Sequence, residues 1–264
     1  MDASIVQALV LGVVQGLSEF LPISSSGHLV IFPWLFGFSD PGLSFDVALH
    51  AGTLVAVLGY FWRDWLNIVR LRRDMPDYHG ASNTLLFLVL ATIPGALAGA
   101  LFEKQAETIF RDPLLIATTL FVFGALLLAA DTFGRKTRSF GEITLWDACA
   151  IGCAQALAIV PGVSRSGITI TAALARSINR ASAARFSFLL STPIILAALL
   201  SHAEAFLVVG ITPAFVVGVL SSAISGYLAI SYLIRFVERA SYRAFFWYRT
   251  TIAAIIVFVI FFHV

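Results

Sequence analysis

Charged side chains are scarce in this chain of 264 residues: they make up 12% of it, while hydrophobic residues make up 59%. A soluble domain of this length could not bury so much apolar surface. The apolar residues also run continuously instead of alternating, which argues against a β-barrel. The net charge of +2 is too small to indicate a nucleic-acid partner. These properties predict an all-α integral membrane protein.

Cysteine is nearly absent as well, with only Cys149 and Cys153. Because the two thiols are four residues apart, they share one face of a predicted helix, a spacing that disfavours a disulfide. Two thiols alone are too few ligands for a zinc site. We therefore expect both to be buried packing residues. A cleavable signal peptide is not expected, because no basic segment precedes the apolar N-terminal run.

Apolar runs near the ~20 residues that a bilayer requires predict six transmembrane helices. They cover residues 44–62, 83–102, 113–131, 183–201, 211–233 and 245–262. Two pairs of shorter segments remain, residues 3–20 with 23–37 and residues 145–160 with 164–175. Pro22 interrupts the first pair and Pro161 the second. Irregular backbone within a membrane is tolerated where protein buries it, so we predict two re-entrant helical hairpins.

An internal repeat with an offset of 140 residues relates the two hairpins. Gly12, Gln15, Leu17, Ser24, Ser26 and Gly27 recur as Gly152, Gln155, Leu157, Ser164, Ser166 and Gly167. The predicted spans bring the first copy in from one side of the membrane and the second from the other. We therefore predict a single polytopic domain, 1–264, built as an inverted-topology repeat of residues 1–131 and 145–264, whose hairpin tips meet near the midplane.

Basic residues lie almost entirely on one predicted side of the membrane. That side holds Arg63, Arg70, Arg72, Arg73, Arg135, Lys136, Arg138, Arg176, Arg180, Arg185, Arg235, Arg239 and Arg243, and the other only Lys104 and Arg111. The positive-inside rule makes the arginine-rich side cytoplasmic. We expect Arg176, Arg180 and Arg185 to serve topology and lipid headgroups. The aromatic residues Trp62, Trp146, Tyr242, Trp247 and Tyr248 lie near span ends, where interfacial belts are common.

The second hairpin tip has the chemistry of a phosphate site. The guanidinium of Arg165 is permanently charged and presents a planar set of donors. Around it lie small and hydroxyl residues with accessible backbone N–H groups: Gly162, Ser164, Ser166, Gly167 and Thr169. Ser164 is also a good N-cap for the outgoing helix, and helix N-termini attract anions.

The first tip has similar small residues, Ser24, Ser26 and Gly27, but carries Glu19 and His28 in place of an arginine. Gln15 and Glu19 are four residues apart and offer hard oxygen ligands for Mg²⁺ or Ca²⁺. Ser25 would act as the nucleophile or orient a water, with His28 carrying the proton.

Structural roles compete with each of these assignments. Glu19 could serve only as the ion-pair partner of Arg165, the three serines could simply cap the returning helix, and His28 could be a packed histidine. Asp46 and His50 are expected to be helix-end residues, with a supporting role near the site as the alternative.

The residues described so far resemble the undecaprenyl-diphosphate phosphatase family of bacterial inner membranes, also called bacitracin-resistance proteins. The resemblance covers the whole length and rests on three segments. They are Gln15–Glu19 as a Glu/Gln-x-x-x-Glu motif followed by Phe20-Leu-Pro-Ile-Ser-Ser-Ser-Gly-His28, Phe45-Asp-Val47 with His50 and Gly52, and Pro161-Gly-Val-Ser-Arg-Ser-Gly-Ile-Thr169. Position 15 is glutamine here, where many members have glutamate, which leaves Glu19 as the stronger metal ligand.

The resemblance implies hydrolysis of undecaprenyl diphosphate to undecaprenyl phosphate and inorganic phosphate, with a divalent metal and a site open to the periplasm. It implies catalytic roles for Glu19, Ser25, His28 and Arg165. The expected partners are the prenyl diphosphate and membrane lipids, and the oligomeric state stays open, with a homodimer as one option. The alternative function is a lipid-phosphate flippase or anion transporter, since inverted repeats also build carriers. A carrier, however, has no need of Glu19 and His28 beside the phosphate site.

Overall fold

The computed structural model describes residues 4–37, 42–70, 81–203 and 212–262. Within these ranges the chain is helical, without a strand, and six helices are long and apolar enough to cross a membrane. They are α3 (Leu43–Tyr60), α5 (Ala81–Glu107), α6 (Pro113–Phe133), α9 (Arg180–Ser201), α11 (Pro213–Arg239) and α12 (Arg243–Phe262). Each coincides with one predicted span. The prediction of an all-α membrane protein is therefore confirmed.

Two pairs of shorter helices accompany these six, at the positions that the breaker residues predict. The first pair is α1 (Ile5–Phe20) with α2 (Ser25–Phe36), and the second is α7 (Leu145–Ala156), extended by the short η4 (Leu157–Ile159), with α8 (Arg165–Ala175). At about 1.5 Å per residue, α2, α7 and α8 are each about 16–18 Å long, well below the ~30 Å hydrocarbon core. Their lengths suit re-entrant hairpins, which stay a prediction here.

Repeat-related glycines let the first helix of each pair approach a long helix closely. A Cβ added at Gly12 of α1 would lie 2.4 Å from the carbonyl oxygen of Gly218 in α11. A Cβ added at Gly152 of α7 would lie 2.8 Å from the carbonyl oxygen of Ala91 in α5. Small residues at such crossings allow two backbones to pack directly against each other. The same glycine thus makes the same kind of contact in both halves, although the division into two repeats stays a prediction.

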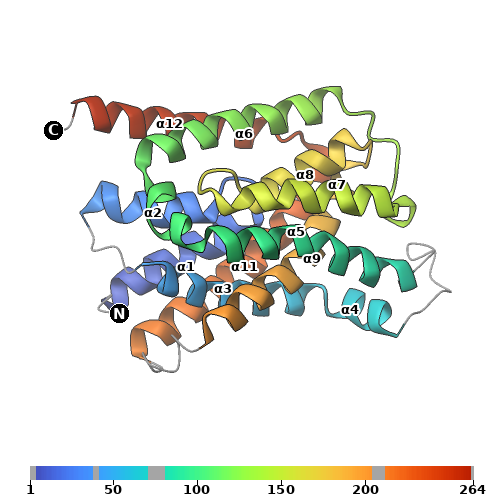
Figure 1. Ribbon diagram of the computed structural model, residues 1–264, viewed down its shortest axis with the longest axis horizontal. Helices are drawn as coiled ribbons and strands as arrows, with labels where there is room; N and C mark the ends of the chain where they lie inside the picture. Colours follow the sequence, from blue (N-terminus) through green and yellow to red (C-terminus); the bar gives the residue numbers. More distant parts are fainter. Residues whose placement is uncertain (1–3, 38–41, 71–80, 204–211, 263–264) are drawn as a thin grey trace.

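Acidic side chains bind many of the arginines at one end of the bundle. Asp131 pairs with Arg180, Asp147 with Arg138 and Arg176, and Asp64 with Arg185. In Figure 1, α4 (Trp62–Val69) and the connection from α6 to α7 lie together at this end, away from both termini. The expectation that Arg176, Arg180 and Arg185 serve lipid headgroups is therefore wrong, because each has a carboxylate partner. Arg72 and Arg73 of the predicted cytoplasmic side lie outside the described residues.

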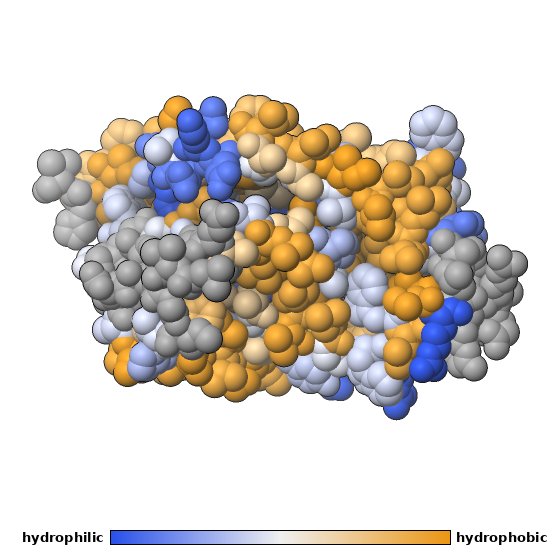
Figure 2. Space-filling model, turned by 60° about the horizontal axis from the view of Figure 1, so that its bottom comes forward, coloured by the Kyte–Doolittle hydropathy of each residue, from blue (hydrophilic) through white to orange (hydrophobic). Residues whose placement is uncertain are grey.

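The outer surface is mainly hydrophobic, as a lipid environment requires. Figure 2 shows hydrophobic residues across the middle of one face and the most hydrophilic ones toward its two ends. Trp62, Trp146 and Trp247 are exposed, as an interfacial belt predicts, whereas Tyr242 is buried. Cys149 and Cys153 are both exposed, so the expectation that they are buried is wrong. The face of α7 that packs on α5 is the one that carries Gly152.

Candidate functional site

The first tip, residues 21–28, turns the chain between α1 and α2. Pro22 follows the end of α1, and Ser24 takes a backbone conformation, φ 77° and ψ 93°, that is rarely adopted by a residue with a side chain. The Oγ of Ser24 accepts a hydrogen bond of 3.3 Å from the N–H of Gly27. Ser24 is therefore the N-cap of α2, which is the capping role that competed with a ligand-binding role.

The second tip, residues 161–168, repeats this local structure. Ser164 has φ 71° and ψ 112°, and its Oγ accepts a hydrogen bond of 3.1 Å from the N–H of Gly167. The prediction that Ser164 caps the outgoing helix is confirmed. The two tips thus place a serine in the same unusual conformation at positions 140 residues apart.

The tips contact each other directly. The N–H of Gly162 donates to the Oγ of Ser24 at 2.9 Å, and the hydroxyl of Ser166 donates to the carbonyl of Leu21 at 3.2 Å. Gly162 has φ 91°, and a Cβ there would come within 2.0 Å of the hydroxyl oxygen of Thr119. Only glycine therefore fits at this position. These bonds fix the two irregular segments against each other.

Glu19, at the last turn of α1, joins the polar groups of both tips. Its side chain is 4% exposed, and its Oε1 accepts from the Nη2 of Arg165 at 2.7 Å. Its Oε2 accepts from the hydroxyl of Ser25 at 2.5 Å. The Nη1 of Arg165 donates to the carbonyl of Ser187 in α9 at 2.9 Å. The structure therefore brings together the acid, hydroxyl and arginine that the sequence predicts at one site.

Gln15 completes the oxygen ligands that were predicted for a metal. Its Nε2 donates to the Oε2 of Glu19 at 3.1 Å, while its Oε1 is buried and has no hydrogen-bond partner among the described residues. Those residues hold no cluster of three or more His, Cys, Asp or Glu side chains suited to a metal. Mg²⁺ commonly takes one or two carboxylates together with substrate phosphates and waters. One carboxylate and one orphaned amide oxygen fit that pattern.

His50 of α3 is the functional candidate that sequence reasoning undervalued. Its Nε2 lies 3.4 Å from the Oε2 of Glu19, and its Nδ1 bonds to the carbonyl of Asp46 at 2.7 Å. Asp46 lies in the first turn of α3, as expected, but its carboxylate also pairs with Arg111 at 3.1 Å. The signal was the pairing of Asp46 and His50 four residues apart, yet their proximity to Glu19 depends on helix packing.

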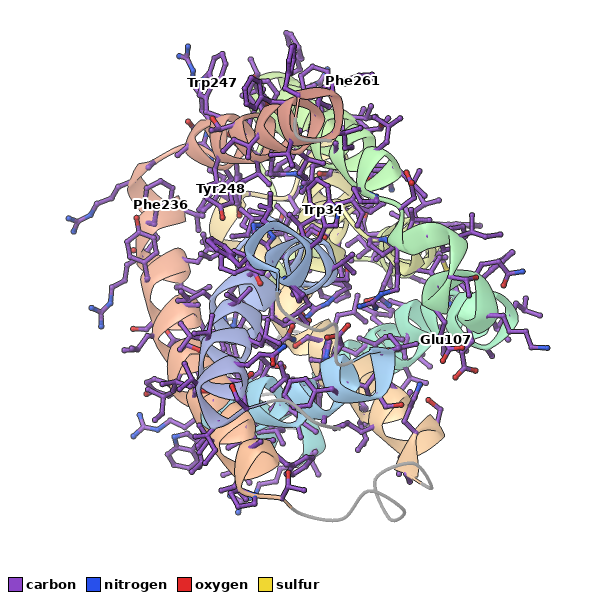
Figure 3. All side chains as sticks on the ribbon, turned by 90° about the vertical axis from the view of Figure 1, so that its left-hand side faces the viewer. Trp34, Glu107, Phe236, Trp247, Tyr248 and Phe261 are labelled. Carbon is purple, nitrogen blue, oxygen red and sulfur yellow. The ribbon has the colours of Figure 1, made fainter. Side chains whose placement is uncertain are left out.

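His28 faces away from this cluster. Its Nδ1 bonds to the carbonyl of Ser24 at 2.7 Å, and its Nε2 bonds to the hydroxyl of Tyr248 in α12 at 2.9 Å. The two rings are nearly parallel, with centroids 5.6 Å apart. In Figure 3, Tyr248 points from α12 toward α2, whereas Trp247 points away from the bundle. Within the described contacts, His28 therefore touches a backbone carbonyl and Tyr248 instead of Ser25 or Glu19.

The residues predicted to bind substrate divide into two groups by burial. Ser24, Gly27, Gly162, Ser164, Ser166, Gly167 and Thr169 are all buried. Thr169, for example, bonds to the hydroxyl of Ser187 at 2.7 Å. Ser25, Ser26 and Arg165 are partly exposed. The buried group shapes the two tips, and only the exposed three present side-chain atoms to a ligand.

Known proteins with similar sequences were compared once this geometry was clear. The family model described as bacitracin resistance protein BacA matches residues 8–255. Undecaprenyl-diphosphatase from Moorella thermoacetica is 52% identical over 254 residues, which cover 96% of this chain and 97% of that protein. Undecaprenyl-diphosphatase from Pelotomaculum thermopropionicum is 49% identical, with 93% of each chain covered. Undecaprenyl-diphosphatase from Desulforudis audaxviator is 51% identical, with 95% and 96% covered.

Proposed function

This chain belongs to the bacitracin resistance protein BacA family, and we propose that it is an undecaprenyl-diphosphatase. It hydrolyses undecaprenyl diphosphate to undecaprenyl phosphate and inorganic phosphate. The reaction returns the lipid carrier to the synthesis of peptidoglycan and other cell-wall polymers, and it confers bacitracin resistance. The relatives' names support a phosphatase over the alternative of a flippase or anion transporter.

The observation that carries the chemistry is the contact of Glu19 with both Ser25 and Arg165. A guanidinium has five N–H donors, and the described contacts of Arg165 use two of them, to Glu19 and Ser187. The remaining donors are suited to the oxygens of a phosphoryl group. A nucleophile within hydrogen-bond reach of a base is the arrangement that covalent catalysis requires.

The proposed reaction begins when the Oγ of Ser25 attacks the terminal phosphorus and its proton passes to Glu19. The bond from that phosphorus to the bridging oxygen breaks, and undecaprenyl phosphate leaves. Water then attacks the phosphoserine, releases inorganic phosphate and restores the hydroxyl. The short bond from Ser25 to Glu19 supports this route over one in which Ser25 only orients a water. Arg165 stabilises the charge that develops on the phosphoryl oxygens.

A divalent ion, Mg²⁺ or Ca²⁺, is part of the proposal, held by Glu19 and Gln15. Such an ion polarises the phosphoryl group and offsets its negative charge. His50 beside Glu19 keeps that carboxylate within a polar network, and we assign it a supporting role. His28 holds the first tip through Ser24 and Tyr248, so its proposed role as proton carrier requires the ring to be reached through other groups.

We place the protein in the bacterial inner membrane with its arginine-rich end in the cytoplasm. The excess of basic residues on that side supports this orientation. The amino terminus would then lie outside, and the two tips would form a re-entrant site open toward the periplasm. The prenyl tail would remain among the membrane lipids while the diphosphate reaches Arg165.

Phosphate release from a prenyl diphosphate by the purified protein in detergent tests the function. With Mg²⁺ or Ca²⁺ the wild type should release phosphate, and Arg165→Ala should lose this activity. Arg235→Ala is the matched control, because it removes the same charge from an exposed position of α11. A carrier would release no phosphate in detergent, so an inactive wild type would refute the proposal.

A further inference from the structure

Arg249 is a fully buried arginine near the middle of α12, and nothing in the proposed chemistry uses it. A charged side chain inside a membrane bundle is costly and usually has a specific partner. Among residues 4–37, 42–70, 81–203 and 212–262, no carboxylate forms an ion pair with Arg249. Its positive charge is therefore balanced by other groups.

Those groups are backbone carbonyls from three separate segments. Arg249 donates to Leu120 (2.9 Å) and Thr119 (3.3 Å) of α6, to Pro22 (3.2 Å) of the first tip, and to Gly162 (2.7 Å) and Val163 (3.2 Å) of the second tip. All three nitrogens of the guanidinium take part. A planar donor set of this kind can bind several acceptors at once, which an ammonium group does less well. One side chain therefore joins both tips to α6.

Two glycines leave room for the guanidinium. A Cβ added at Gly167 in α8 would lie 3.1 Å from the Nη1 of Arg249. A Cβ added at Gly124 in α6 would lie 3.3 Å from its Nε. Both distances are tighter than usual van der Waals contact, so the space is matched to an arginine in this orientation.

We propose that Arg249 is the positioning residue that sets the two tips in register for phosphoryl transfer. Pro22 lies three residues before Ser25, and Val163 lies two residues before Arg165. Holding both carbonyls on one guanidinium fixes the attacking hydroxyl relative to the phosphate-binding arginine. The permanent positive charge behind the tips also favours a bound diphosphate. This inference rests on the proposed phosphatase function.

Kinetics of Arg249→Lys and Arg249→Met separate the two effects. Lysine keeps the charge but cannot reach all five carbonyls, so we expect kcat to fall by about tenfold with KM nearly unchanged. Methionine loses both, so we expect kcat to fall by about a hundredfold and KM to rise, because small misplacements of reacting groups have large kinetic costs. Wild-type kcat in both variants would overturn the proposal.

Ile256→Ala is the control for a purely structural effect. Ile256 is buried in the same helix and packs in the cluster with Ile116 and Leu120, without contacting either tip. We expect it to lower the thermal midpoint while kcat of the remaining folded enzyme stays near wild type. If Ile256→Ala lowers kcat as much as Arg249→Met does, Arg249 has only a structural role.

Gly124→Ala provides a milder test that keeps Arg249 in place, for use if Arg249→Met does not fold. The added methyl displaces the guanidinium by a few tenths of an ångström, and we expect kcat to fall by about threefold. Hydrogen exchange in peptides covering residues 21–28 and 161–168 should rise in Arg249→Lys and Gly124→Ala but stay unchanged in α9. Unchanged exchange and kcat in both would overturn the proposal. An inactive wild type, in contrast, would refute the phosphatase function and not this assignment.

Discussion

The two tips have nearly the same backbone and very different side chains. Ser24 and Ser164 share positive φ values of 77° and 71°, and each caps its helix through the N–H of a glycine three residues later. Each serine hydroxyl also lies near that of a second serine, at 3.4 Å and 3.3 Å. The repeat therefore specifies a scaffold, a strained turn opening a helix, that is built twice and joined face to face.

The chemistry is divided between the copies. Positions 19, 25 and 28 hold Glu19, Ser25 and His28, whereas the positions 140 residues later hold Ile159, Arg165 and Ile168. The acid and the hydroxyl thus come from one tip and the cation from the other, and they meet as an ion pair across the repeat. Neither tip alone contains a complete site. The comparison shows that a symmetric scaffold serves here to bring unlike side chains together.

The largest effect should come from breaking the contact between the unlike residues. Glu19→Gln and Arg165→Gln should each lower phosphate release by about 10²–10³-fold, because each removes a charge placed for the transition state. Glu103→Gln, at an exposed acid, is the matched control and should retain wild-type activity. Near-normal turnover in either site variant would mean that the ion pair only stabilises the fold.

A smaller but still large difference is expected between two adjacent serines of the first tip. Ser25→Ala should lower kcat by about 10²-fold or more, because it removes the hydroxyl bonded to Glu19. Ser26→Ala should cost only a few-fold, since the Ser26 hydroxyl bonds only weakly to Ser24, at 3.4 Å. Trapping a phosphoserine and locating it by mass spectrometry would identify the nucleophile. Equal losses in the two variants would contradict the assignment.

The two capping serines offer a matched pair for stability. Ser164→Ala should lower the free energy of unfolding by about 1 kcal/mol through loss of the helix cap. Ser24→Ala should lower it by about 2 kcal/mol, because it also removes the bond from Gly162 that joins the tips. Thermal or denaturant unfolding in detergent would measure both. If the order were reversed, the bond between the tips would contribute little.

The smallest effect should separate the repeat-related glutamines. Gln15→Ala should raise the Mg²⁺ or Ca²⁺ concentration for half-maximal activity by about tenfold, the lower end of losses at metal-site partners. Gln155→Ala should leave it unchanged, since the Nε2 of Gln155 donates to the carbonyl of Ala91 in α5. A metal titration of phosphate release measures both variants. Parallel shifts would place the metal elsewhere.

Much of the fold could be predicted because its determinants are local. Continuous apolar runs define the six long helices, and Pro22 and Pro161 mark both tips. Glu19 and Arg165 were paired because opposite charges in an apolar chain have few alternative partners. His50 and Arg249 were not assigned, for different reasons. His50 meets Glu19 only through the packing of α3 against α1, and Arg249 binds backbone carbonyls, which every residue carries and which leave no pattern in a sequence.

The amino-acid sequence by itself determined the membrane class, the helix boundaries, the repeat and the residue types of the site. Each of these depends on hydrophobicity or backbone preference within a short segment. Only the tertiary structure decided which groups meet: His50 with Glu19, Arg249 with both tips, and His28 with Tyr248. Such contacts depend on the close approach of helices far apart in the chain, where burial requires every polar group to find a partner and several partners were available.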